Sequence, residues 1–139
     1  MGKSEQSILD SIPNSLPALS RATKIQKKCA SVGFDWDSLG PVVDKVREEI
    51  DEVMEEALQV NVAQDKVELE LGDLLFATVN FARHLQVNPE VALAKANLKF
   101  VKRFQLVEQK VAQNGLQIEQ CDLAQLDGWW DEVKQDERR

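Results

Sequence analysis

The chain has 139 residues, enough for one domain with a core, and its 24 acidic and 17 basic residues give a formal net charge of −7. This negative balance argues against a nucleic-acid backbone as the main partner, because phosphates attract basic surfaces. No apolar run approaches the ~20 residues that cross a membrane, and the N-terminus lacks the apolar segment of a signal peptide, so we expect a cytoplasmic protein.

Three regions are predicted along the chain: a flexible segment, one helical domain and a frayed tail, at residues 1–14, 15–135 and 136–139. The first helix should begin at Asn14 or Ser15 and end before Gly33, because apolar residues recur between them on one helix face. Two large aromatic residues, Phe34 and Trp36, lie in the loop that follows. Their rings either fill the core between helices or form a wall on which a nucleobase stacks.

Two further helices are predicted on either side of a short polar turn, NVAQD, and should form an antiparallel hairpin. The second opens at Pro41 and ends near Val60, and the third runs from about Gln64 to Leu85. Gly72 lies in the middle of the third helix, where it costs about 1 kcal/mol relative to Ala. Close approach of a neighbouring helix would account for a glycine at that position.

Acidic residues follow one face of both helices in this hairpin. Glu49 and Glu52 are three residues apart, as are Glu70 and Asp73, so each pair shares a helix face. Counted from the turn, the two pairs differ in height by roughly 6 Å, about one helical turn. Four adjacent carboxylates repel one another unless a cation binds among them, and Mg²⁺ prefers oxygen ligands. The alternative is a solvated acidic face with two available i,i+4 ion pairs, Lys45–Glu49 and Lys66–Glu70.

The fourth helix is predicted from Asn88, as N-cap before Pro89, to about Gln113. Lys99 and Arg103 are four residues apart on a face separate from its apolar side. These two cations serve either solubility and pairing with acidic helices, or a clamp for phosphates.

A capping box, Asp122 with Gln125, starts a fifth helix that carries Trp129 and Trp130. Because adjacent helical residues point in different directions, we expect one indole inside the protomer and the other against a second protomer or the substrate. No strand pattern competes with these helices. We therefore predict an all-α fold, a bundle of about five helices with a four-helix core that dimerisation completes.

The acidic motifs and their flanking segments resemble a known enzyme family. EEIDE followed by ELGD, with 18 residues from Glu52 to Glu70, resembles the EExxE…ExxD signature of the all-α nucleoside triphosphate pyrophosphohydrolases. The segments KIQKKCASVGFDW, GDLLFATVNFARHL and ANLKFVKRF resemble the MazG branch, in the same order. The similarity covers roughly residues 15–135, and the chain looks like the C-terminal, catalytic domain of a two-domain MazG protein.

This resemblance implies an enzyme, a tight homodimer, that hydrolyses nucleoside triphosphates at the α–β phosphoanhydride and removes non-standard or excess nucleotides. Its products are the monophosphate and pyrophosphate. Mg²⁺, for which Mn²⁺ should substitute, would be held by four carboxylates, Glu49, Glu52, Glu70 and Asp73. Either Glu48 or Glu49 would accept the proton of the attacking water. The other expected roles are phosphate binding by Lys45, Lys66, Lys99 and Arg103, and base binding by Trp36 and Trp130.

Two other functions fit the same residues. Within the superfamily, a dUTP or dCTP hydrolase or a phosphoribosyl-ATP hydrolase shares the acidic signature. A different class is a non-catalytic helical dimer that binds a metal or a protein partner through its acidic face. Release of pyrophosphate from mixed triphosphates separates the enzymes from the binding protein.

Overall fold

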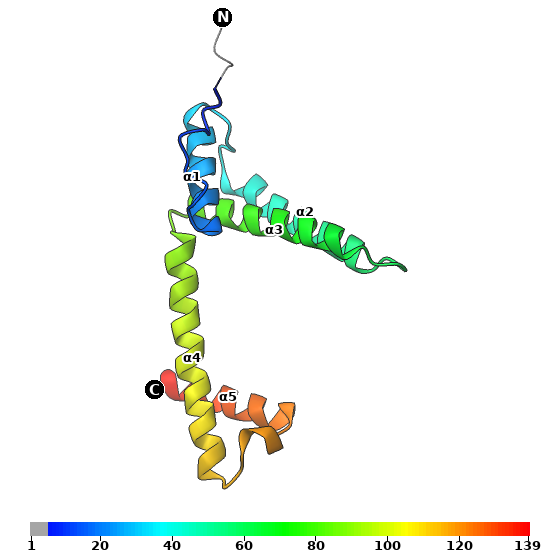
Figure 1. Ribbon diagram of the computed structural model, residues 1–139. Coiled ribbons are helices and arrows are strands. Elements are labelled where there is room, and N and C mark those ends of the chain that lie inside the picture. The colour runs from blue at the N-terminus through cyan, green and yellow to red at the C-terminus, as the bar shows by residue number, and fades with distance from the viewer. Residues whose placement is uncertain (1–5) are drawn as a thin grey trace, which may run out of the picture. The chain divides into compact units, whose positions relative to one another are not determined.

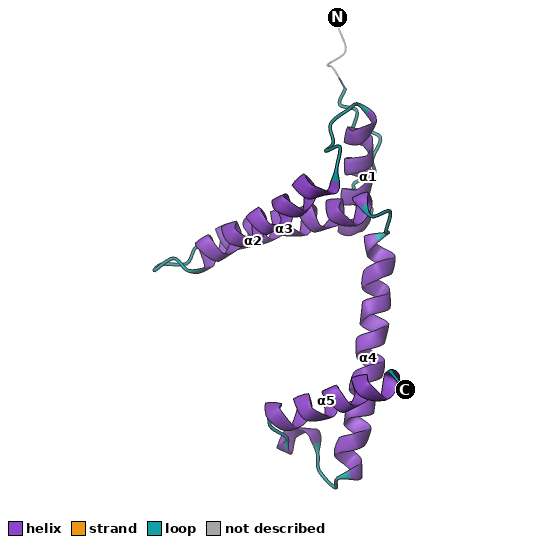
Figure 2. Ribbon diagram, turned by 180° about the vertical axis from the view of Figure 1, so that it is seen from behind, coloured by secondary structure: helices purple, strands orange, loops and turns teal. Residues whose placement is uncertain are grey.

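The computed structural model describes residues 6–139 as five α-helices with one short 3₁₀ helix, η1, and shows no strand among those residues (Figures 1 and 2). The helices, in chain order, are α1 Ala18–Ser31, α2 Leu39–Ala57, α3 Gln64–His84, α4 Pro89–Gln113 and α5 Leu123–Glu137, with η1 at Ile118–Gln120 before α5. The predicted all-α class is therefore confirmed. None of the described helices is both long enough and apolar enough to cross a bilayer.

The chain divides into two compact units between Val91 and Ala92, within α4. In the first unit α2 and α3 lie side by side as an antiparallel hairpin, and α1 packs against α3 (Figures 1 and 2). Its most buried apolar side chains include Val42, Val79 and also Ile12. Ile12 comes from the segment predicted to be flexible, of which residues 1–5 lie outside the described part.

The second unit has its own small core, in which α5 packs on the C-terminal part of α4. Val107, Val111 and Val133 are almost completely buried there, and both Trp129 and Trp130 pack against them. The expectation that only one indole would face this core was wrong. The two side chains leave α5 about 100° apart, but their rings are large enough to reach the three small valines from either flank.

Local hydrogen bonds explain where α1 ends. At the end of α1, Phe34 N–H donates to Cys29 C=O at 3.0 Å and Gly33 N–H donates to Ala30 C=O at 3.0 Å, the pattern of a Schellman motif. Gly33 has a φ of +90°, a left-handed conformation that favours glycine. This motif directs the chain from α1 into the loop that carries Trp36.

Three helices have boundaries that differ from the prediction. Helix α1 begins at Ala18, with Pro17 as its N-cap residue, whereas the prediction was Asn14 or Ser15. Helix α2 begins at Leu39 instead of Pro41 and ends at Ala57 instead of near Val60. Helix α5 continues to Glu137, two residues into the tail expected to fray, where the Glu137 carboxylate bonds Arg103.

Apolar side chains remain partly uncovered on the α2–α3 hairpin. Ile50 and Met54 on α2 are 45% and 48% exposed, and Leu71 and Leu75 on α3 are 44% and 53% exposed. The predicted reason for Gly72 was wrong, because a Cβ at that position would meet nothing within 4 Å among residues 6–139. The hairpin thus has apolar surface that no neighbouring helix of its own unit covers.

Candidate metal and nucleotide site

The hairpin brings the acidic faces of α2 and α3 together. Glu49 on α2 and Glu70 and Asp73 on α3 each offer a carboxylate oxygen, and these three oxygens lie within 4.8 Å of one another. Glu52 lies close enough to Glu70 to raise the pKa of that carboxyl. Three of the four residues predicted to hold a cation thus offer converging oxygens, and we call these three together with Glu52 the acidic cluster.

The acidic cluster is electrostatically unfavourable on its own. Burial raises the pKa of Glu70, and the hydrogen bond from Glu52 with the nearby charges of Asp73 and Glu49 raises it further. Two carboxylate oxygens, Glu49 Oε2 and Glu70 Oε2, are buried and have no hydrogen-bond partner among the described residues. Such orphaned, anionic oxygen donors are what a hard divalent cation such as Mg²⁺ requires, so the residues fit the metal.

The residues near the acidic cluster in the sequence differ in their ion pairs and in their exposure to solvent. Lys45 Nζ lies 3.1 Å from Glu49 Oε1 and 3.6 Å from Glu48 Oε1, and the Glu49 carboxylate raises the pKa of Lys45. Glu49 is almost fully buried, whereas the Glu48 side chain is 56% exposed. Lys66 is exposed, and within residues 6–139 it forms no ion pair within 4 Å, so the proposed Lys66–Glu70 pair is absent there.

A cavity of about 600 Å³ adjoins the acidic cluster and lies entirely within the first unit. Its wall includes Glu49, Asp73 and Lys45 on the acidic side and Phe34 and Trp36 from the loop after α1. The volume is in the range of small-molecule sites in proteins. Neither aromatic residue fills a core, because Phe34 is 80% exposed and Trp36 is 42% exposed.

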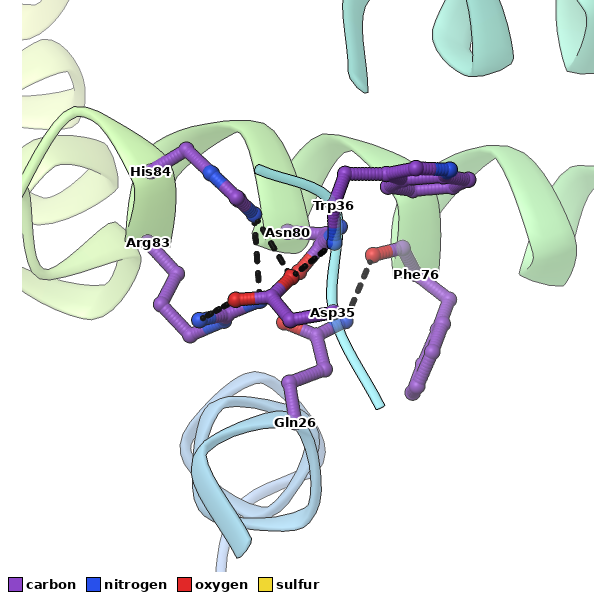
Figure 3. Close-up of polar contacts among 7 residues, drawn as sticks. All are labelled: Gln26, Asp35, Trp36, Phe76, Asn80, Arg83 and His84. Atoms are coloured by element: carbon purple, nitrogen blue, oxygen red, sulfur yellow. Dashed lines mark hydrogen bonds and ion pairs between the residues drawn. The ribbon is translucent and has the colours of Figure 1, made fainter. Parts of the chain in front are cut away.

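A polar network fastens the Trp36 loop to the C-terminal end of α3 (Figure 3). The Arg83 guanidinium donates to both carboxylate oxygens of Asp35, at 3.0 and 2.7 Å, and His84 Nε2 lies 2.8 Å from Asp35 Oδ1. The Arg83 hydrogen bonds hold the pKa of Asp35 well below its usual range. Sequence reasoning missed this network, since no periodicity links residues so far apart in the chain.

The second unit contains the other residues predicted to contact substrate. Arg103 donates to both oxygens of Glu137, at 2.9 to 3.1 Å, and lies 5.9 Å from the centre of the Trp130 ring. Trp130 also contacts Phe100, with ring centres 5.2 Å apart. The Lys99 charge acts on the same glutamate and helps to lower the pKa of Glu137, after the larger effect of Arg103.

Comparison of the sequence with known proteins identifies the family of the chain. Residues 41–112 match the MazG nucleotide pyrophosphohydrolase domain. The chain is 61% identical over 135 residues to the nucleoside triphosphate pyrophosphohydrolase of Escherichia coli strain K12, covering 97% of this chain and 51% of that protein.

Two other relatives are more distant. The nucleoside triphosphate pyrophosphohydrolase/pyrophosphatase MazG of Thermotoga maritima is 42% identical over 96% of this chain and 50% of its own length. The uncharacterized protein YabN of Bacillus subtilis is 43% identical over 98% of this chain and 28% of its own. The chain thus spans about half the length of the first two relatives. Since the domain match alone covers more than half of its 139 residues, the chain belongs to the MazG nucleotide pyrophosphohydrolase domain family.

Proposed function

We propose that the protein hydrolyses nucleoside triphosphates to the monophosphate and pyrophosphate in a Mg²⁺-dependent reaction. The observation that carries this proposal is the acidic cluster, with two orphaned buried oxygens, beside a cavity that is large enough for a nucleotide and whose wall includes Glu49 and Asp73. The names of the Escherichia coli and Thermotoga maritima relatives support the reaction class. When bound, the cation would neutralise phosphate oxygens and make a water more acidic.

The acidic residues divide between holding the cation and moving a proton. Glu49, Glu52, Glu70 and Asp73 would hold the cation; oxygens of Glu49, Glu70 and Asp73 lie within 4.8 Å of one another, and Glu52 raises the pKa of the adjacent Glu70, which supports this assignment. Glu48 lies outside this group and is exposed, so we assign it the role of accepting the proton of the attacking water. Lys45 and Lys66 lie four residues before Glu49 and Glu70, respectively, and would offset phosphate charge.

The remaining substrate contacts are proposed for the aromatic residues and the cations of α4. Trp36 offers its ring to a nucleobase from the wall of the cavity. Lys99 and Arg103 are the phosphate ligands that we propose on α4, and Trp130, next to Arg103, is a further proposed contact with the nucleotide.

A second copy of the chain is the partner that we propose for the uncovered α2–α3 surface. Ile50 and Met54, and likewise Leu71 and Leu75, follow one another at i,i+4 spacing and form two exposed apolar rows. Apolar rows of this kind are stabilised when a neighbouring subunit removes them from water.

Pyrophosphate release from each standard and deoxy triphosphate and from phosphoribosyl-ATP, with Mg²⁺ and with excess chelator, tests the function. We expect turnover only with the divalent cation, and the substrate profile would reveal a dUTP, dCTP or phosphoribosyl-ATP hydrolase. Glu70→Gln should abolish turnover and, because it removes repulsion in the metal-free cluster, should slightly raise the metal-free melting temperature. Turnover unaffected by chelator, or the absence of turnover with every triphosphate, would contradict the proposal.

A further inference from the structure

The cavity wall contains a buried amide, Gln26 on α1, that the proposed reaction does not use. Gln26 is only 6% exposed and lines the cavity. Its Nε2 donates to the backbone carbonyl of Phe76 on α3 at 2.9 Å (Figure 3). Its Oε1 is also buried but has no hydrogen-bond partner among the described residues.

The orientation of the Gln26 amide follows from its partner. A backbone carbonyl only accepts hydrogen bonds, so the NH₂ group must face Phe76, and the oxygen must be the unpaired atom. A buried acceptor without a donor is unfavourable, and buried polar atoms nearly always have a partner. An N–H group on a molecule in the cavity would supply the missing donor.

Asn80 is a second buried amide in the wall of the same cavity, and in this residue the oxygen, rather than the NH₂ group, is engaged by a neighbour. Arg83 donates to Asn80 Oδ1 through Nε at 3.1 Å and through a terminal nitrogen at 2.7 Å. Because a guanidinium only donates, Asn80 must direct its oxygen towards Arg83, which Asp35 in turn anchors. The Asn80 Nδ2 makes no hydrogen bond within residues 6–139, so it remains a donor.

The cavity therefore offers one acceptor and one donor, both preset, together with the Trp36 ring. All four standard nucleobases combine a flat ring with an N–H group next to an acceptor on the Watson–Crick edge. We propose that Gln26 Oε1 accepts the N–H of the base and that Asn80 Nδ2 donates to the neighbouring acceptor. This inference rests on the proposed function, and it makes the two amides the residues that recognise the Watson–Crick edge of the base.

Substrate pairs that differ by one amino group test the role of Gln26. ATP is compared with purine riboside triphosphate, which lacks the 6-amino group, and CTP with the 2-pyrimidinone riboside triphosphate, which lacks the 4-amino group. In at least one pair, the wild type should prefer the amino-bearing substrate by about 10-fold or more in kcat/KM, because the analogue leaves the buried acceptor unpaired. In Gln26→Met the ratio should fall to about 1, since the acceptor is gone.

Two further variants separate this role from a structural one. Gln59→Met removes a similar bond, from a side-chain amide to the Glu55 carbonyl, at an exposed site away from the cavity, and should keep the wild-type ratio. Asn80→Asp keeps the oxygen that Arg83 contacts but removes the donor, so it should lower kcat/KM for both members of a pair about equally.

Several results would overturn the inference while leaving the proposed function in place. These are equal rates within both pairs for the wild type, an unchanged ratio in Gln26→Met, or wild-type rates in Asn80→Asp. Absence of pyrophosphate from every substrate would overturn the inference together with the function. Because each ratio is measured on a single preparation, partial misfolding of a variant cancels.

Discussion

Asp35 shows how a single side chain can hold a loop of the cavity wall in place. Its carboxylate, 24% exposed, is held by Arg83, which is 13% exposed, and by His84. Both partners lie on α3, whereas Asp35 lies one residue before Trp36. The position of the Trp36 ring is therefore linked to the end of α3 through one ionised group.

We predict a pH-dependent loss of stability when Asp35 is replaced by Asn. At pH 7 the free energy of unfolding should fall by about 1.5–3 kcal/mol, the value of hydrogen bonds to a charged group. The folded protein lowers the pKa of Asp35, so its contribution is present above the unfolded-state pKa of about 4 and is lost as the pH falls towards the folded-state value.

Urea unfolding of the wild type and Asp35→Asn at pH 7, 5, 4 and 3 measures this contribution. The difference between the two proteins should shrink as the pH falls below about 4. Asp37→Asn, two residues further along the same loop and exposed, is the matched control. A difference that grows between pH 4 and pH 3 would have the wrong sign for the ion pair with Arg83.

At the scale of elements, α4 and α5 are joined by two sets of ion pairs with different expected roles. Arg103 of α4 bonds Glu137 near the end of α5, while Lys110 lies 3.6 Å from both Glu132 and Asp136. Arg103 is a proposed phosphate ligand, and Lys110 is not. A phosphate on Arg103 would compete with the carboxylate that holds it in this structure.

This competition gives a kinetic prediction for Arg103 and its neighbours. Arg103→Ala or Lys99→Ala should raise KM or lower kcat for a triphosphate by about 10-fold or more, and less for a diphosphate, because charge-assisted contacts are lost. Glu137→Gln should lower KM for the triphosphate, since Arg103 no longer pairs with an anion. Lys110→Ala removes the other set of ion pairs and serves as the control. Wild-type kinetics in both Arg103→Ala and Lys99→Ala would exclude the clamp.

The elements that sequence reasoning located correctly are those defined by local chemistry. Asn88 Oδ1 accepts from the N–H groups of Glu90 and Val91, and Asp122 with Gln125 forms the predicted capping box. The i,i+3 spacing of the acidic residues, on two helices of a predicted hairpin, correctly indicated that carboxylates of α2 and α3 would meet. By contrast, Asp35 and Arg83 are 48 residues apart and Arg103 and Glu137 are 34 apart, so only the folded chain reveals these pairs.

At the scale of the whole molecule, the exposed rows on the α2–α3 hairpin determine the expected assembly. Ile50→Glu or Leu75→Glu should convert a dimer into a monomer, because each change places a charge in a surface that the partner would bury. Helix content should be retained, since both side chains are about half exposed in the protomer.

Light scattering after size-exclusion chromatography, together with circular dichroism, measures both properties. Leu69→Glu is the control, because Leu69 is 71% exposed on α3 but lies about 200° around the helix from Leu71. A monomeric wild type, or variants that remain dimers, would contradict the proposed assembly.

The orphaned oxygens of Glu49 and Glu70 also have a consequence for the lifetime of the protein in the cell. A ligand that binds only the folded chain stabilises it by mass action, by about 2.7 kcal/mol when its concentration is 100-fold above its dissociation constant. Chains without the proposed cation would therefore unfold more often and be exposed to proteases for a larger fraction of the time. The abundance of the protein would then follow the supply of the proposed cation, even when no nucleotide is present.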